Sequence, residues 1–456
     1  MTDWAILYDQ QPAGAFVYDS GMDTPDTAEL THPFWVFVWA DVMHPEVAFC
    51  GIALFFSGIL CSAAGIGGGG IYVAVLMVTG KLTPHNAVPL SKAIVFFGSI
   101  ASLFVNMYKA LGSGGTSAPK SVIDTDACRL VVPATLIGTF LGVLLNRHTS
   151  DYLIVILLTA LLGFMTGMVV QTARKQALDE SGLSADGGIG SADEHTPLLS
   201  ASSQDPGPSS VMPASPTKGR PSSADAVLGF GLLLVVVIGG VLRFHMHACR
   251  AEVLGDLSKV GACNHPVNLL FHHHMELWMH EPVTSMVLQQ LVWSIPIWSC
   301  VGITVYYGFL ANRDVGWEAR RVVLYQAVAV ITGLLAGLVG VGGGLIFSPF
   351  FLLTGMDPAI AVGTSATCVL FTSSSTTLQY IFTDRIMMSL AVVYGIVCLV
   401  ASFLGTYLVH YIQDRFARKS FITTIVALGV GLSAVLSVMK FCYLVSAATE
   451  QATVPA

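Results

Sequence analysis

The sequence has few charged residues for its length. Only 11% of its 456 residues are Asp, Glu, Lys or Arg, and 54% are hydrophobic, whereas about 25% of a typical soluble domain is charged. A soluble protein with so few charges could not cover its surface with polar groups. The charges are missing from long stretches, and about 20 apolar residues suffice to cross the hydrocarbon core of a bilayer. The composition therefore predicts an integral membrane protein that crosses the bilayer several times.

Lys and Arg are absent from residues 1–45, which carry seven acidic residues. A secretory signal peptide begins with a basic region followed by an apolar run, and this segment has neither feature. Its apolar patch at 34–39, which includes Trp35 and Trp39, is too short to span a bilayer and suits the membrane interface. We therefore expect residues 1–45 to form an acidic extracytoplasmic segment.

The nine cysteines form no CxxC pair, and the strand–loop–helix pattern of a nucleotide-binding site is also missing. Most of the cysteines lie in or beside apolar runs, where a small buried hydrophobe is the default interpretation. The apolar runs hold few of the clustered acids, histidines or cysteines that a membrane-embedded enzyme would need. The sequence therefore predicts neither an enzyme nor an ATP-driven pump, and it indicates no catalytic residue and no cofactor.

Apolar runs divide the chain into two halves joined by linking spans. Each half is expected to hold four long runs and one shorter apolar element, and two spans link the halves, which gives an all-α fold with about twelve membrane elements. The first transmembrane repeat covers 46–171 and the second covers 320–446. Residues 172–225 form a Ser-, Gly- and Pro-rich loop that is expected to be disordered and cytoplasmic. Residues 226–319 hold the two linking spans with a His-rich outer loop, and residues 447–456 form a C-terminal tail.

A glycine cluster followed by a short apolar element occurs in both halves. Gly65–Gly70 precede Ile71–Val78, and Gly340–Gly344 precede Leu345–Leu353. The clusters align at an offset of 275 residues (340 − 65), and after a one-residue shift a downstream Pro, an Ala-Val pair and a Ser also align. Internal repeats of this kind are typical of transporter folds.

The distribution of Lys and Arg among the loops indicates the topology. If both short elements cross the membrane, the loops richest in Lys and Arg fall on one side, as cytoplasmic loops do. Both termini are then outside, and the halves start from opposite sides. The sequence therefore predicts two inverted repeats, each with a glycine-broken short helix.

A glycine cluster that leads into a short helix at membrane depth suits an anion. Glycine lets the backbone approach a ligand closely, and a helix start aims unpaired N–H groups and the positive end of its dipole at the break. Two such starts near the midplane would bind an anion, although glycine clusters also serve close helix packing. The predicted substrate-binding residues are Gly67, Gly68, Gly69, Gly70, Ser91, Lys92, Gly342, Gly343, Gly344, Thr364 and Ser365.

Lys92 lies within an otherwise apolar run. An ionisable group inside a membrane span is costly and usually functional, so Lys92 is a candidate positive charge for the anion; the alternative is a lysine that extends to the membrane interface. In the second half, the hydroxyls of Thr372–Thr377 are expected mainly to bond to the preceding helical turn. Asn106 and Gln379 are weaker candidates for lining a cavity.

Two loops carry further candidate binding features. Residues 244–283 hold seven His and two Cys, but their spacings match no defined zinc pattern, so we predict no metal site and a solvated, pH-sensitive loop. Glu194, Leu198 and Leu199 have the form of an acidic dileucine signal, which would bind a sorting adaptor. Such a signal favours an endosomal or vacuolar membrane of a eukaryote, with the plasma membrane as the alternative.

The two glycine clusters and the residues after them resemble the TauE/SafE family of sulfite exporter-type permeases, in its eukaryotic branch. The resemblance covers about 46–172 and 320–446, and it rests on Gly65–Gly70, Pro84, Ala87, Ser91, Lys92, Gly340–Gly344, Pro349, Pro358, Gly363, Thr364 and Ser365. It implies secondary transport of sulfur-containing anions such as sulfite, sulfonates or thiosulfate.

We therefore expect a secondary transporter that moves a small anion across the lipid bilayer by alternating access of one repeat against the other, with no nucleic-acid partner. The alternative is a membrane receptor or scaffold that binds partners through its His-rich and dileucine-bearing loops.

Overall fold

The computed structural model describes residues 42–63, 67–112, 123–185, 229, 231–240, 282–356, 358–382, 385–415, 431–443 and 445–446. Within these ranges the fold is all-helical, with twelve helices and no strand, which confirms the predicted fold class. The predicted sorting residues Glu194, Leu198 and Leu199, and nearly all of the His-rich loop, lie outside the described residues.

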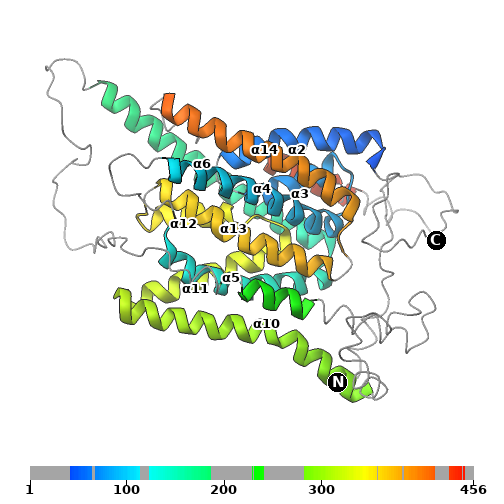
Figure 1. The fold of residues 1–456 in the computed structure, drawn as a ribbon. Helices are drawn as coiled ribbons and strands as arrows, with labels where there is room; N and C mark the ends of the chain where they lie inside the picture. The colour runs from blue at the N-terminus through cyan, green and yellow to red at the C-terminus, as the bar shows by residue number, and fades with distance from the viewer. Residues whose placement is uncertain are drawn as a thin grey trace.

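The helices lie side by side in one bundle (Figure 1). The first half contains α2 (Pro45–Ala63), α3 (Gly69–Val78), α4 (Pro84–Gly112), α5 (Thr125–His148) and α6 (Asp151–Ala185). A short helix at Gly231–Gly240, α10 (Pro282–Leu310) and the π-helical turn η4 (Ala311–Val315) follow. The second half contains α11 (Ala319–Val339), α12 (Gly344–Leu353), α13 (Pro358–Ile381), α14 (Met388–Arg415) and the short helix Gly431–Tyr443.

Local sequence signals explain several helix boundaries. Proline is the first residue of four of these helices, including α2, α4 and α13, where its missing N–H costs no hydrogen bond. Asp124 caps α5, because its carboxylate accepts from the N–H groups of Asp126 and Ala127, each at 3.0 Å. Gly340 ends α11 with a φ of 82°, a left-handed conformation that glycine adopts readily.

Helix α6 is longer than the sequence indicates. The disordered loop was expected to begin at 172, whereas α6 continues to Ala185. The added segment contains Ala, Leu, Lys, Gln and Glu, which are good helix formers, so the helix extends past its apolar part.

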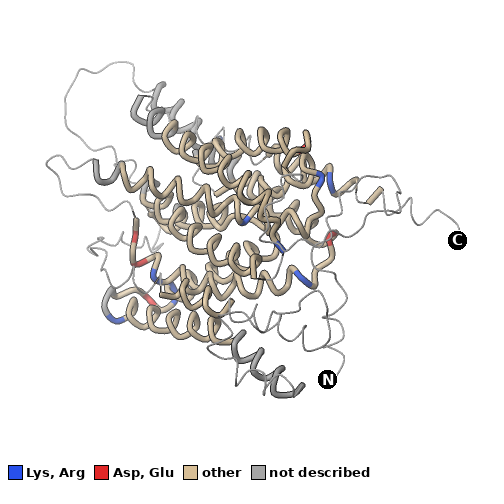
Figure 2. Tube along the Cα trace, turned by 45° about the vertical axis from the view of Figure 1, so that its right-hand side comes forward, with Lys and Arg blue, Asp and Glu red and all other residues tan. Residues whose placement is uncertain are grey.

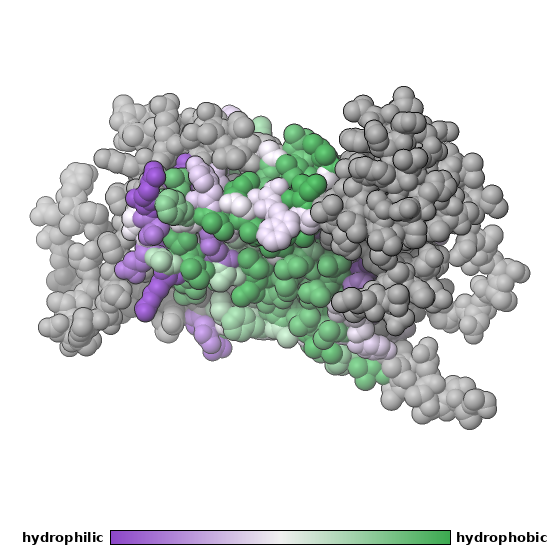
Figure 3. All heavy atoms as spheres, turned by 90° about the horizontal axis from the view of Figure 1, so that it is seen from below, coloured by the Kyte–Doolittle hydropathy of each residue, from purple (hydrophilic) through white to green (hydrophobic). Residues whose placement is uncertain are grey.

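Seven helices in the described residues are long and apolar enough to cross a membrane. Charged residues gather at the two opposite ends of the bundle, and few lie between them (Figure 2). A broad hydrophobic area covers the middle of the face in Figure 3, with hydrophilic residues gathered at one end. Large apolar side chains such as Phe49, Phe56 and Trp298 are more than 60% exposed, as expected for contact with lipid.

Contacts between helix ends define the two ends of the bundle. Lys81 donates to Glu46 at 2.7 Å, so α3 ends where α2 begins; we call this end A. Tyr325 donates to Thr354 at 3.0 Å, so α12 ends where α11 begins; we call this end B. Helix α5 ends at end A, just before Asp151. Helix α11 runs parallel to α5 and therefore begins at end B, whereas α2 begins at end A. The sequence relationship between the halves stays a prediction.

Helices from different halves make the closest packing. Parallel α5 and α11 contact each other through small residues: a Cβ at Gly138 would lie 2.1 Å from the oxygen of Val330, and one at Gly333 would lie 2.1 Å from that of Thr135. Helix α14 runs parallel to α2 and α4 and packs on both, and a Cβ at Gly405 would lie 2.4 Å from the oxygen of Ile59. These contacts exclude any larger side chain.

Candidate functional site

The two glycine clusters lie against each other through their main chains. A Cβ at Gly69 would lie 2.2 Å from the nitrogen of Gly342 and 2.5 Å from the oxygen of Gly340. A Cβ at Gly342 would lie 3.0 Å from the oxygen of Gly67 and from the nitrogen of Gly69. We call this contact, formed by Gly67–Gly70 and Gly340–Gly344, the glycine crossing.

Backbone conformation at the crossing also requires glycine. Gly67, Gly68 and Gly340 have φ values of 72°, 63° and 82°, in the left-handed region that L side chains rarely adopt. The chain therefore turns sharply just before α3 and just after α11. The turns bring the start of α3 and the loop before α12 together.

The helix starts at the crossing present unpaired donors. The N–H groups of Gly69, Gly70, Gly343 and Gly344 have no hydrogen-bond acceptor among the described residues, and all four residues are buried. An unpaired buried N–H costs roughly 1–3 kcal/mol, and the positive ends of two helix dipoles add to these donors. The crossing is therefore suited to an acceptor of negative charge.

Lys92 reaches the crossing from α4. Its side chain is 2% exposed, and its Nζ donates to the oxygen of Val341 at 2.6 Å. It therefore lies inside the bundle, not at the membrane interface. The neighbouring Ser91 donates to the oxygen of Val88 at 2.7 Å and lies 3.4 Å from that of Gly340.

Thr364 and Ser365 make different contacts from those at the crossing. Thr364 accepts from the N–H of Asp124 at 2.9 Å, so it holds α13 against the start of α5. Ser365 accepts from the hydroxyl of Ser348 on α12 at 3.0 Å. The structure thus brings the predicted glycines, Ser91 and Lys92 together, whereas the hydroxyls of Thr364 and Ser365 join α13 to its neighbours.

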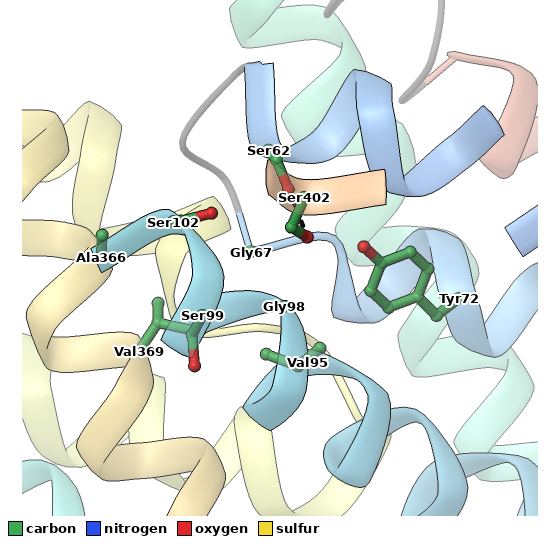
Figure 4. A pocket seen from close by; sticks show the side chains of 10 residues that line it. All are labelled: Ser62, Gly67, Tyr72, Val95, Gly98, Ser99, Ser102, Ala366, Val369 and Ser402. Atoms are coloured by element: carbon green, nitrogen blue, oxygen red, sulfur yellow. Dashed lines mark hydrogen bonds between the residues drawn. The ribbon is translucent and has the colours of Figure 1, made fainter. Parts of the chain in front are cut away.

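A small cavity lined by several hydroxyl groups and apolar side chains adjoins Gly67 (Figure 4). Its volume is about 20 Å³, which is room for about one water molecule. Ser62 and Ser402 lie together on one side of it, and Tyr72 and Ser99 lie on others. The lining residues come from five helices and the loop before α3: Ser62, Gly67, Tyr72, Val95, Gly98, Ser99, Ser102, Ala366, Val369 and Ser402.

The hydroxyls of this cavity interact with one another. Ser62 donates to Ser402 at 2.6 Å, and Thr406 donates to Ser102 at 3.2 Å one turn further along α14. These residues could not be predicted from the sequence, because nothing next to a single Ser or Tyr in an apolar helix shows that it shares a cavity with residues of other helices. The four-residue spacing of Ser402 and Thr406 on α14 does indicate that these two hydroxyls share one face of the helix.

The hydroxyl run on α13 behaves as expected for polar residues in an apolar helix. Thr372, Ser373, Ser374 and Thr376 bond to carbonyls of the preceding turn at 2.7–3.0 Å. Gln379, a candidate for lining a cavity, donates to Ser375 at 3.0 Å.

Comparisons with known proteins agree with this architecture. The family model described as sulfite exporter TauE/SafE matches residues 50–251 and 284–432. Sulfite exporter TauE/SafE family protein 5 of Arabidopsis thaliana is 25% identical over 402 residues, which are 86% of this chain and 82% of that protein. Family protein 3 of the same plant is 26% identical over 416 residues, 88% and 79% of the two chains. No solved structure matches the chain significantly.

The matched ranges cover well over half of the chain, and they include both glycine clusters and both helices that follow them. The chain therefore belongs to the sulfite exporter TauE/SafE family of multi-pass membrane transporters.

Proposed function

We propose that this transporter carries a small sulfur-containing oxyanion or organosulfonate, and that the anion binds at the glycine crossing. The observation that supports the proposal is the contact between the two glycine clusters inside the bundle. It places two helix starts and one buried lysine at one point.

The crossing supplies two kinds of attraction for an oxyanion. The N–H groups of Gly69, Gly70, Gly343 and Gly344, which have no acceptor among the described residues, are donors that need no side-chain ordering. Lys92 supplies an amine that is positively charged when protonated, and its present partner is a carbonyl that an anion can replace. A protonated amine attracts an anion by the Coulomb energy of opposite charges, which a neutral carbonyl lacks, so protonated Lys92 favours the anion over the oxygen of Val341.

The size of the adjoining cavity supports a transport cycle with more than one state. About 20 Å³ holds about one water molecule, which is less than the four heavy atoms of sulfite require. The anion-bound state therefore needs the crossing to open. We infer alternating access, in which the crossing opens to one end of the bundle at a time.

The choice of a sulfur anion rests on the family and its relatives. The family description and the names of the matched plant proteins specify sulfite export. The chemistry of the crossing fits this class of anion, because main-chain N–H donors and one ammonium group can bind tetrahedral and pyramidal oxyanions alike.

A flux assay in liposomes tests the proposal. The purified chain is reconstituted, and the uptake of sulfite, thiosulfate, an alkyl sulfonate and sulfate is followed under an anion gradient, a proton gradient and a membrane potential. We expect saturable uptake of at least one sulfur anion above that of protein-free liposomes. Uptake of none of them under any gradient, by protein that remains folded, would refute the proposal.

A further inference from the structure

Four polar side chains join both halves of the protein at end A. Arg385, between α13 and α14, lies 3.0 Å from Nδ1 of His85 through its Nη2, and its Nη1 donates to the amide oxygen of Asn146 at 3.3 Å. Nε2 of His85 lies 3.4 Å from Oδ1 of Asp151 at the start of α6. The cluster thus connects α4, α5 and α6 of the first half with a loop of the second half.

The same cluster is tied to the end of α11 that enters the glycine crossing. Asn146 donates through Nδ2 to the oxygen of Leu338 at 2.7 Å, two residues before Gly340. The main-chain oxygen of Tyr380 accepts from the main-chain N–H of Arg385 at 3.0 Å, and the phenol hydroxyl of Tyr380 donates to the main-chain oxygen of Gly337 at 2.6 Å. A displacement of Arg385 would therefore be felt directly at the second glycine cluster.

Charged groups are costly where this cluster lies. His85 and Asp151 have side chains only 26% and 36% exposed, and burial lowers the pKa of Arg385, because partial removal from water disfavours its charged form. At the same end, Lys81 and Glu46 form an ion pair in which the lysine side chain is 56% exposed, while Glu46 is as exposed as Asp151, at 36%. A half-buried charged cluster that bridges both halves suggests a role beyond the surface pairing of helices.

We propose that His85, Asn146, Asp151 and Arg385 form the gate that closes the glycine crossing at end A. The proposal rests on the proposed transport function, because a gate requires a path that opens at this end. Breaking the contacts of Arg385 releases the loop between α13 and α14 from α4 and α5, and it frees the last turn of α11.

The hydrogen bonds make this gate sensitive to protons. A guanidinium only donates, so Nδ1 of His85 accepts from Arg385 and carries no proton. Protonation of Nδ1 places an N–H against the guanidinium and two positive charges in contact. The titratable groups that face His85 and Arg385 are Asp151 of α6 and, toward Arg385, Tyr380 of α13 and Arg147 of α5. Asp151 has an Oδ1 without a hydrogen-bond donor among the described residues, so it can hold the protonated ring after Arg385 leaves.

Cysteine labelling tests the gate without reference to any substrate. Thr139→Cys or Gln379→Cys places a thiol beside the last turn of α11, and a membrane-impermeant thiol reagent is added from the end A side and, separately, from the end B side. Labelling above that of the parent protein, which has its own cysteines, is measured. We expect Arg385→Gln to raise labelling from end A by at least about tenfold, because charge-assisted contacts of this kind contribute roughly 1.5–3 kcal/mol, and to leave labelling from end B unchanged.

Two further variants separate a gate from a general loss of packing. His85→Gln keeps an acceptor for Arg385 and a donor toward Asp151 but does not titrate, so its labelling from end A should stay low between about pH 5 and 8. The ratio of the parent's labelling rate to that of His85→Gln should rise as the pH falls across that range, whereas the loss of thiolate slows both proteins alike. Lys81→Gln breaks the exposed ion pair at the same end and should change nothing.

The gate would be refuted by unchanged labelling in folded Arg385→Gln, or by an equal rise in Lys81→Gln. If Arg385→Gln does not fold, Arg385→Lys keeps the charge while losing the two-nitrogen geometry, and the same rise is expected. Should labelling change as described while no sulfur anion is transported, the gate would stand and the substrate assignment would fall.

Discussion

The ammonium nitrogen of Lys92 lies 2.6 Å from the main-chain oxygen of Val341, so a charged side chain of the first half is bound to the glycine cluster of the second. Methionine at position 92 would fill a similar volume without charge. We expect Lys92→Met to reduce anion flux by at least about tenfold, because one charge-assisted hydrogen bond contributes roughly 1.5–3 kcal/mol. Flux in liposomes measures this, with Lys81→Met as the control, since Lys81 is an exposed lysine at end A. Equal flux in Lys92→Met and the parent would contradict a role for this charge.

Gly69→Ala should disrupt the crossing. The added methyl group would lie 2.2 Å from the nitrogen of Gly342, so the two main chains must separate. We expect a lower melting temperature in detergent and a loss of flux. Gly163→Ala is the matched control, because a Cβ at Gly163 meets no atom within 4 Å. If the two variants melt alike and transport alike, the contact is not required.

Filling the hydroxyl cavity should hinder transport more than it hinders folding. Ser402→Leu removes the acceptor of Ser62 and occupies the space beside Gly67. We expect reduced flux at low substrate concentration, because the crossing then has less room to open. The matched control is Ser299→Leu, since the half-buried Ser299 lies outside the cavity and its hydroxyl donates to Ile295 of its own helix. Normal uptake by a folded Ser402→Leu variant would separate this cavity from the transport path.

The ion pair between Lys81 and Glu46 should have little influence on stability near neutral pH. The hydrogen bond and charge of Glu46 raise the pKa of Lys81. Any contribution is therefore complete below the unfolded-state pKa and is lost only as the pH rises through the folded-state pKa, above about pH 10. Melting temperatures of Lys81→Gln and the parent should agree to within about 1 °C at pH 7 and above pH 10 alike, because exposed pairs contribute little. A clear loss at pH 7 would show that the pair is structurally important.

Several parts of the fold could be read from the sequence because they depend on local patterns. Long apolar runs predict most of the spanning helices, and the glycine clusters predict the breaks before α3 and α12. The sequence does not determine whether Lys92 is buried, since a lysine eight residues into a helix can lie in the core or extend toward an interface. Its contact with Val341 depends on how distant segments pack.

The cavity and the cluster at end A could not be predicted in this way. Ser62, Ser99 and Ser402 come from three helices, and nothing in their neighbours along the chain shows that they meet. Thr364 was assigned to the site by its alignment with the first half, but its face of α13 lies toward Asp124. Alignment of repeats fixes depth along a helix, whereas the direction of a side chain depends on which helix packs beside it.

The packing of α5 on α11, and of α14 on α2 and α4, has a mechanical consequence. Each tightly packed group contains helices from both halves of the chain. Neither half can therefore move as one rigid body unless the main chains that are in contact at Gly138, Gly333 and Gly405 slide past each other. The moving parts of this carrier are then composite bodies, each assembled from both segments of the polypeptide. Severing the chain between residues 186 and 228 should therefore yield two fragments that work only when they are produced together.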